Sequence, residues 1–129
     1  MSANEVQVSS NTAAVVFEAR GFHLLLTLSG CDPEMLDDET KLKQLAGAAA
    51  TATGATVLQL VSHKFQPQGV TALALLAESH ASLHSYPESG LVFWDCFTCG
   101  DECKPELSVN FLVDALKPKK INQQLVHRE

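Results

Sequence analysis

Residues able to supply a nucleophile, proton carriers and a thiol lie close together in the middle of this chain. Residues 77–88 read Ala-Glu-Ser-His-Ala-Ser-Leu-His-Ser-Tyr-Pro-Glu, and residues 97–101 read Phe-Thr-Cys-Gly-Asp. Together they hold a hydroxyl, two imidazoles, carboxylates and a thiol, which can activate a nucleophile, move protons and polarise a carbonyl. Apolar runs of strand length bound both segments, so we expect a β-sheet to position them.

Each of these residues also has a structural interpretation. A single serine beside a strand is usually structural, and histidines at a sheet edge are usually half-buried residues with hydrogen-bond partners. Ser79, however, is accompanied by Glu78, His80 and His84. Spacing alone leaves the catalytic and the structural interpretations open.

The cysteines offer a rival chemistry. Cys96 and Cys99 form a C-x2-C pair, Cys103 follows, and His80 and His84 lie upstream, so a tetrahedral zinc site is conceivable. Cys96 falls inside an apolar strand, where a buried thiol is the default. In an extended segment the two histidines share a face about 13 Å apart, too far to hold one metal. We therefore expect no metal site.

Composition limits the classes of partner. The 129 residues are 46% hydrophobic, carry a formal charge of -6 and have a pI near 5.3, so we expect one domain, 1–129, that binds neither nucleic acid nor anionic membrane. No segment is apolar over the length of a bilayer, and the first residues do not follow the plan of a signal peptide. Four cysteines in such a chain are expected to be thiols. The sequence therefore predicts a cytoplasmic protein.

Hydrophobic periodicity predicts a sheet with helices on one face. We expect strands at 22–28, 55–63, 70–77 and 91–98 and an edge strand at 121–126. This order with two helices is typical of an α+β two-layer sandwich, whose mainly antiparallel sheet leaves one face uncovered. Such a face favours a dimer that pairs sheet against sheet.

Two helices are expected between these strands. The first begins near Asp38 and ends at a Gly54 cap, with apolar positions at i, i+3, i+4, i+7 and i+11: Leu42, Leu45, Ala46, Ala49 and Thr53. The second has Pro105 in its first turn. Its predicted apolar side consists of Leu107, Phe111, Leu112 and Ala115.

A series of motifs resembles one known family. They occur in the same order and at matching spacing over most of residues 20–116: Gly21-Phe-His-Leu-Leu, Cys31-Asp-Pro, His63-Lys-Phe-Gln-Pro-Gln-Gly-Val, Glu78-Ser-His, His84-Ser-Tyr-Pro-Glu and Phe97-Thr-Cys-Gly-Asp. The chain resembles the bacterial-type S-adenosylmethionine decarboxylase proenzymes, which cut themselves and make a pyruvoyl group from a serine.

The resemblance implies a self-cleaving enzyme. Ser79 would attack the carbonyl carbon of Glu78 in an N-to-O acyl shift, giving a β chain, 1–78, and an α chain, 79–129, that begins with a pyruvoyl cofactor. His84 matches the residue that handles protons in processing, and Thr71 matches a hydroxyl that assists it. Cys99 matches the acid that protonates the product, a role that suits a thiol, which is mostly protonated near neutral pH.

The resemblance also implies a substrate and a dimer. Phe65 and Tyr86 match aromatic residues that stack on adenine, and Glu88 matches a carboxylate that binds ribose hydroxyls. The expected reaction converts S-adenosylmethionine into the aminopropyl donor for spermidine and other polyamines, in a homodimer of αβ protomers. Ser85-Tyr86 replaces the usual Thr-Trp pair, and Ala72 replaces a common glycine. Arginine or ornithine decarboxylation on the same scaffold remains an alternative, as does a non-catalytic Cys/His metal-binding module.

Overall fold

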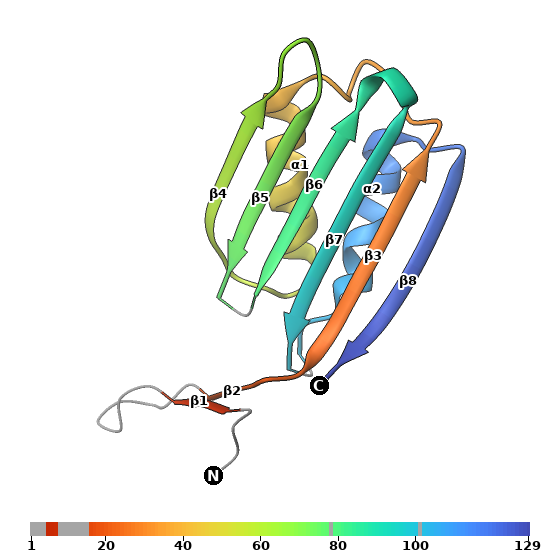
Figure 1. Ribbon diagram of the computed structural model, residues 1–129. Helices are drawn as coiled ribbons and strands as arrows, with labels where there is room; N and C mark the ends of the chain where they lie inside the picture. Colours follow the sequence, from red (N-terminus) through yellow and green to blue (C-terminus); the bar gives the residue numbers. More distant parts are fainter. Residues whose placement is uncertain (1–4, 8–15, 78, 101) are drawn as a thin grey trace.

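Six antiparallel strands form one sheet, and two helices cover one of its faces in the computed structural model (Figure 1). Residues 5–7, 16–77, 79–100 and 102–129 are described, the side chains only from residue 19 onward. Glu78, one side of the expected cleavage site, lies outside the described residues. The elements are β1 (Glu5–Gln7), β2 (Val16–Glu18), β3 (Gly21–Ser29), α1 (Glu39–Ala52), β4 (Val57–Lys64), β5 (Val70–Leu76), β6 (His80–Tyr86), β7 (Leu91–Cys99), α2 (Val109–Leu116) and β8 (Lys120–Arg128).

The strand order in the large sheet is β4-β5-β6-β7-β3-β8, and every neighbouring pair is antiparallel. β1 and β2 form a separate two-stranded pair. The predicted α+β sandwich is therefore confirmed. In the part of the chain that the structure describes, no helix is long and apolar enough to cross a membrane.

Helix α1 begins and ends where the sequence predicts. The Asp38 side chain accepts a hydrogen bond from the Lys41 amide at 3.1 Å, which caps the helix start. The helix ends before Gly54, whose φ of +96° suits glycine. Leu42, Ala46 and other positions on the predicted apolar side are fully buried against the sheet.

The second helix differs from its prediction. Pro105–Ser108 form a 3-10 turn, and only Val109–Leu116 are α-helical. Leu112 and Leu116 are buried, whereas Leu107 and Phe111 are about half exposed, so the predicted apolar side was wrong at these two positions. The tighter turn rotates Leu107 away from the position it would have in a continuous α-helix. In α2 itself the buried side follows Leu112 and Leu116, four residues apart, so Phe111 falls beside it.

One central strand was not predicted. Residues 80–86 form β6, between β5 and β7, so the sheet has six strands where the sequence indicated five. Its inner face holds Ala81, Leu83 and Ser85, of which only Leu83 is a large apolar residue, and its outer face holds polar side chains. A weak apolar pattern is therefore compatible with a fully paired strand.

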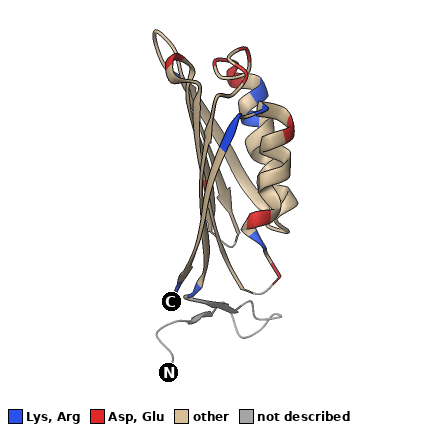
Figure 2. Cartoon of the chain, turned by 90° about the vertical axis from the view of Figure 1, so that its right-hand side faces the viewer, with Lys and Arg blue, Asp and Glu red and all other residues tan. Residues whose placement is uncertain are grey.

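The two faces of the sheet differ in composition. The helix-covered face holds the core, in which buried Trp94 donates a hydrogen bond from Nε1 to Ser108 Oγ at 3.0 Å. The opposite face, called here the open face, carries apolar side chains that are 40–52% exposed, including Leu25, Val61, Leu73, Leu75 and Phe93. In side view most charged residues lie on the helices and at the ends of the strands (Figure 2).

Candidate active site

The predicted site residues lie in two groups at opposite ends of the open face. The first group, called the serine end, contains Ser79 and Cys99, with His23, His80 and Asp95 beside them. The second group, called the aromatic end, contains Phe65, Thr71, His84, Tyr86 and Glu88. β6 connects the two ends: His80 begins the strand and Tyr86 ends it.

The serine end is positioned by the hairpin between β5 and β6 and by the end of β7. The Leu76 amide donates to the Ser79 carbonyl at 2.9 Å, which places Ser79 directly before β6. Cys99 ends β7 and is the register partner of Gly21. A Cβ atom on Gly21 would lie 2.0 Å from the Thr98 carbonyl oxygen, so only glycine allows β3 to approach β7 this closely.

A network of hydrogen bonds centres on Asp95. Its carboxylate oxygen Oδ2 lies 2.7 Å from His23 Nε2 and 3.2 Å from His80 Nε2, and Oδ1 accepts from the Ser82 hydroxyl. Burial alone would raise the pKa of Asp95, but the hydrogen bonds from Ser82, His23 and His80 outweigh it and lower this pKa below its usual value. Asp95 is therefore a carboxylate near neutral pH.

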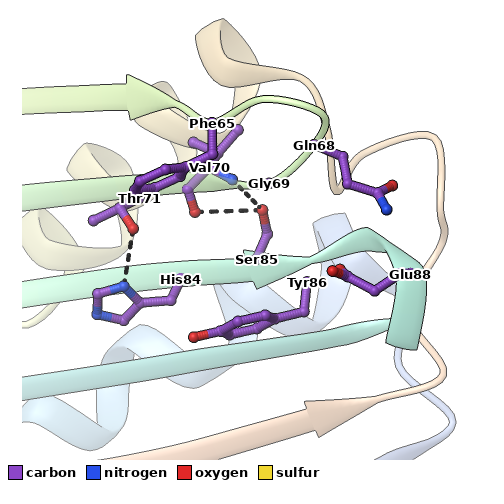
Figure 3. A pocket seen from close by; sticks show the side chains of 9 residues that line it. All are labelled: Phe65, Gln68, Gly69, Val70, Thr71, His84, Ser85, Tyr86 and Glu88. Atoms are coloured by element: carbon purple, nitrogen blue, oxygen red, sulfur yellow. Dashed lines mark hydrogen bonds between the residues drawn. The ribbon is translucent and has the colours of Figure 1, made fainter.

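The aromatic end surrounds a cavity of about 260 Å³ (Figure 3). Phe65 comes from the loop after β4 and Tyr86 from the end of β6, and both rings are more than 40% exposed. Glu88 and Gln68 lie beyond the rings, at the outer rim of the view. Exposed aromatic rings beside a carboxylate are suited to a flat ligand that carries hydroxyl groups.

His84 and Thr71 form the inner wall of this cavity. They are register partners on β6 and β5, and the Thr71 hydroxyl lies 3.0 Å from His84 Nδ1. This contact leaves the Nε2 side of the imidazole for a ligand or another proton carrier. Buried Ser85 fixes the strand behind them, because its hydroxyl donates to the Leu36 carbonyl at 2.6 Å and accepts from the Val70 amide at 2.9 Å.

The loop that carries Phe65 is held by Asp37. Its carboxylate accepts from the Gly69 amide at 2.8 Å and from Lys64 Nζ at 3.0 Å, and these bonds, the first of them most, lower the pKa of Asp37. Gly69 adopts a φ of +104°, a conformation that favours glycine. These contacts hold the turn, and with it the backbone at Phe65, in one conformation.

One chain does not bring all the predicted residues together. Ser79 and His84 are five residues apart along one extended segment, which corresponds to about 16 Å at the rise of a strand. The structure thus groups Ser79 with Cys99, and His84 with Thr71 and the substrate-site candidates. It does not place His84 beside Ser79 within the same chain.

The geometry does not favour the zinc interpretation. Cys96 is fully buried on the helix side of β7, where burial raises the pKa of its thiol to about 12, whereas Cys99 follows the pattern of the opposite face. The two thiols of the C-x2-C pair therefore point to different sides of the sheet. None of the four cysteines forms a disulfide.

Comparisons with known proteins agree on one family. The sequence model of the S-adenosylmethionine decarboxylase family matches residues 22–129. The chain belongs to this family. It is 49% identical over 109 residues to the S-adenosylmethionine decarboxylase proenzyme of Parasynechococcus marenigrum, covering 84% of this chain and 85% of that protein. It is 44% identical over 100 residues to the proenzyme of the same name from Methanococcus maripaludis, covering 78% and 82% of the two chains.

A solved structure supports the family at the level of the fold. The crystal structure of the adenosylmethionine decarboxylase from Aquifex aeolicus matches with a TM-score of 0.77 and 35% identity, over 84% of this chain and 89% of that one. The fold of this chain, with its six-stranded sheet, therefore matches that of a solved decarboxylase.

Sequence reasoning missed part of the serine end. No motif assigns a role to Asp95 or Ser82, and spacing alone left a structural interpretation of His80 open. His80 and His23 do stand inside family-like blocks, Glu78-Ser-His and Gly21-Phe-His. Their contact depends on the pairing of β3, β6 and β7, which joins residues 72 positions apart.

Proposed function

We propose that this protein is a self-processing, pyruvoyl-dependent decarboxylase of S-adenosylmethionine that supplies the aminopropyl donor for polyamine synthesis. The observation that carries the proposal is the open face itself. One sheet surface presents a serine and a thiol at one end and, at the other, a cavity of about 260 Å³ with two exposed aromatic rings and a carboxylate. The names of the relatives favour this substrate over arginine or ornithine and favour an enzyme over a metal-binding module.

The proposed cleavage site is the Glu78–Ser79 bond, which yields chains 1–78 and 79–129. Ser79 directly follows the β5–β6 turn and is only partly buried, so a new chain end formed there fits at the end of the sheet. The pyruvoyl group made from Ser79 would supply a ketone that binds the substrate amine and withdraws electrons from the bond to the carboxylate. Cys99, at the same end, is proposed to donate the proton that replaces the lost carboxyl group.

The aromatic end is proposed to bind the substrate. Phe65 and Tyr86 offer ring faces for the adenine, and Glu88 offers oxygen atoms for the two ribose hydroxyls. The chain's net charge of -6 suits a cationic sulfonium substrate. His84, with its Nδ1 held by Thr71, is proposed to transfer protons during processing.

A homodimer would bring the two ends together. The apolar side chains of the open face, with Val61, Leu73 and Leu75 lining a hollow of about 340 Å³, form a surface that a second sheet could cover. If the two sheets pack face to face with opposite directions, the serine end of one protomer meets the aromatic end of its partner. This arrangement would close the gap of about 16 Å between Ser79 and His84.

The cytoplasm is the proposed compartment. Cys99 must remain a thiol for its proposed role, and all four cysteines lack disulfides in the fold. Reducing compartments keep thiols in that state.

The primary test is the mass of the purified protein. Two fragments with masses that correspond to 1–78 and 79–129, the latter with a ketone in place of its terminal amine, would support the proposal. Ser79→Ala should remain one full-length chain. A split at the same bond in Ser79→Ala would refute self-cleavage through this serine.

The second test measures the release of CO₂ from S-adenosylmethionine, arginine and ornithine by the mature protein. We expect turnover of S-adenosylmethionine alone. Release from only arginine or ornithine would refute the substrate and leave the cleavage chemistry intact.

A further inference from the structure

A continuous chain of hydrogen bonds leads away from the Ser79 hydroxyl. Ser79 Oγ lies 3.3 Å from His80 Nδ1, and His80 Nε2 lies 3.2 Å from Asp95 Oδ2. A hydroxyl, an imidazole and a carboxylate thus stand in line, an order that activates serine nucleophiles in unrelated enzymes. All three belong to the same chain.

The surroundings of Asp95 indicate which nitrogen of each imidazole carries the proton. Arg128 Nη1 lies 3.2 Å from His23 Nδ1, and since arginine can only donate, this nitrogen accepts. The neutral His23 ring therefore carries its proton on Nε2 and donates it to Asp95. A carboxylate only accepts, so the His80 Nε2 that faces Asp95 also carries a proton.

This arrangement leaves the lone pair of His80 Nδ1 directed at the Ser79 hydroxyl. Asp95 has acceptor sites for three donors, two on Oδ2 and the Ser82 hydroxyl on Oδ1. The carboxylate stays ionised because these donors lower its pKa. It can therefore fix the His80 ring and stabilise the positive charge that the ring gains with a proton.

We infer that His80 is the general base that activates Ser79 for self-cleavage, and that Asp95 is the residue that positions His80. The inference rests on the proposed cleavage between Glu78 and Ser79. His80 Nδ1 takes the hydroxyl proton while Ser79 Oγ bonds to the carbonyl carbon of Glu78. The carbon–nitrogen bond then breaks, His80 returns the proton to the leaving nitrogen, and an ester with a free amine results. No oxidant, reductant or added group is needed.

The position of His84 separates its role from this step. His84 is about 16 Å along the strand from Ser79 and hydrogen-bonds Thr71 at the other end of the face. His80, in contrast, contacts the nucleophile within its own chain. Within one chain, His80 and not His84 can therefore act as the base in the acyl shift. Any action of His84 follows this step or requires the partner protomer.

A metal would explain the same cluster less well. The ligand atoms of His23, His80 and Asp95 lie within 4.8 Å of one another. A metal on His23 Nε2 would require this nitrogen to be unprotonated, and a ligating histidine normally donates from its other nitrogen. Arg128 occupies that other nitrogen as a donor, so the observed contacts oppose metal binding.

The decisive experiment follows cleavage of newly made precursor in His80→Ala and His80→Gln. The His80 side chain is 47% exposed, so neither change opens the core. We expect cleavage to slow about 10²–10⁴-fold, and added imidazole to restore part of the rate in His80→Ala. The matched control is His127→Ala, which should mature normally. It removes an exposed histidine on β8 at the end of the sheet that holds Ser79. Cleavage of both His80 variants at the wild-type rate would overturn the inference.

Hydroxylamine, which cleaves esters but not ordinary peptide bonds, identifies the blocked step. Precursor of His80→Ala should resist hydroxylamine because the ester does not form. A variant blocked after the acyl shift should instead be cut at residue 79. Ester accumulation in His80→Ala would overturn the assignment of His80 to the first step.

Nitrogen NMR of histidine-labelled Ser79→Ala precursor tests the positioning role of Asp95. We expect the Nε2 proton of the neutral His80 ring to show the downfield shift of a hydrogen bond to a carboxylate, and to lose this shift when Asp95→Leu is added, which removes the acceptor. An unchanged proton resonance in a folded double variant would overturn the role of Asp95.

These outcomes are distinguishable from failure of the proposed function. If wild-type protein never splits at residue 79, self-cleavage itself is wrong. If it splits and both His80 variants split equally well, only the base is wrong. If EDTA abolishes cleavage and zinc restores it, the cluster is a metal site and the inference fails.

Discussion

The serine end and the aromatic end of the open face differ in how completely their polar groups are paired. At the serine end a line of hydrogen bonds runs from Ser79 to His80, from His80 to Asp95 and from Asp95 to His23. At the aromatic end one side-chain pair, Thr71 and His84, borders a cavity that stands open between Phe65 and Tyr86. The contacts at the serine end fit the proposed reaction of the chain with itself, and the cavity at the aromatic end fits the proposed binding of a ligand.

The contrast predicts that the two ends work in different chains of a dimer. Ser79→Ala removes the nucleophile of the serine end and leaves the aromatic end intact. His84→Ala removes the imidazole of the aromatic end and leaves the serine end intact. Each variant alone should stay uncut. When both are co-expressed with distinguishable tags, mixed dimers combine one intact serine end with one intact aromatic end. The His84→Ala chains in these dimers should then be cleaved, as seen on a denaturing gel.

Two features control this experiment. Only chains that keep Ser79 can be cut, so the tagged Ser79→Ala chain should remain whole in every mixture. If His84→Ala chains stay whole although size-exclusion chromatography finds mixed dimers, the two ends do not combine between protomers.

Cys99→Ala separates catalysis from processing within the serine end. We expect most of the protein to mature, because the hydrogen-bonded groups beside Ser79 remain. Decarboxylation should fall about 10²–10⁴-fold, the usual effect of losing an acid/base group. Fragment masses and CO₂ release measure the two outcomes. Full activity would remove the thiol from the mechanism.

At the aromatic end, Phe65→Ala should weaken binding and spare maturation. Loss of one stacked ring costs about 0.5–1.5 kcal/mol beyond buried area, so KM should rise about two- to tenfold or more. Glu88→Gln should act in the same direction through the ribose hydroxyls. Phe111→Ala, a similarly exposed ring on the helix side, is the matched control. An equal KM in Phe65→Ala and wild type would contradict the adenine site.

The smallest expected effect concerns the stability that Asp95 contributes. Burial opposes its ionised form, but hydrogen bonds from Ser82, His23 and His80 lower its pKa overall. The carboxylate therefore stabilises the fold above the unfolded-state value of about 3.9, and this contribution is lost as the pH falls through the lower folded-state pKa. In the Ser79→Ala background, Asp95→Asn should reduce the free energy of unfolding by about 1–3 kcal/mol at pH 7.

The difference between these two proteins should shrink as the medium is acidified. Urea unfolding at several pH values measures it. A difference that stays constant down to pH 3 would mean that the Asp95 carboxylate is not the group that stabilises the fold.

Local patterns explain which parts of the fold were predictable. Helix α1 has a capping aspartate, a regular apolar period and a terminal glycine, all within one short segment. β6 lacked such a signal, because only Leu83 among its inner residues is a large apolar residue and its outer residues, on the open face, are mostly polar. The 3-10 turn at Pro105–Ser108 also escaped prediction, since proline suits the first turn of either helix type.

The candidate site also has a part that local motifs predicted and a part that they did not. Phe65, Thr71, His84 and Tyr86 were expected from motifs, and the fold places them around one cavity. Ser79 lies about 16 Å from His84 because β6 is an extended strand, and this strand was not predicted. The contacts of Asp95 depend on the register of three strands, a long-range property that spacing along the chain does not encode.

The strand order also determines what a cut at Ser79 can separate. Residues 1–78 contribute β3, β4 and β5 to the large sheet, and residues 79–129 contribute β6, β7 and β8. Because the order is β4-β5-β6-β7-β3-β8, three of the five neighbouring pairs join one fragment to the other: β5 with β6, β7 with β3 and β3 with β8. The fragments are interleaved, so a single broken peptide bond leaves them held by three ladders of hydrogen bonds. If the chain is cut at Ser79 as proposed, folding has to precede the cut, and the two unfolded pieces could re-form the sheet only by meeting again in solution.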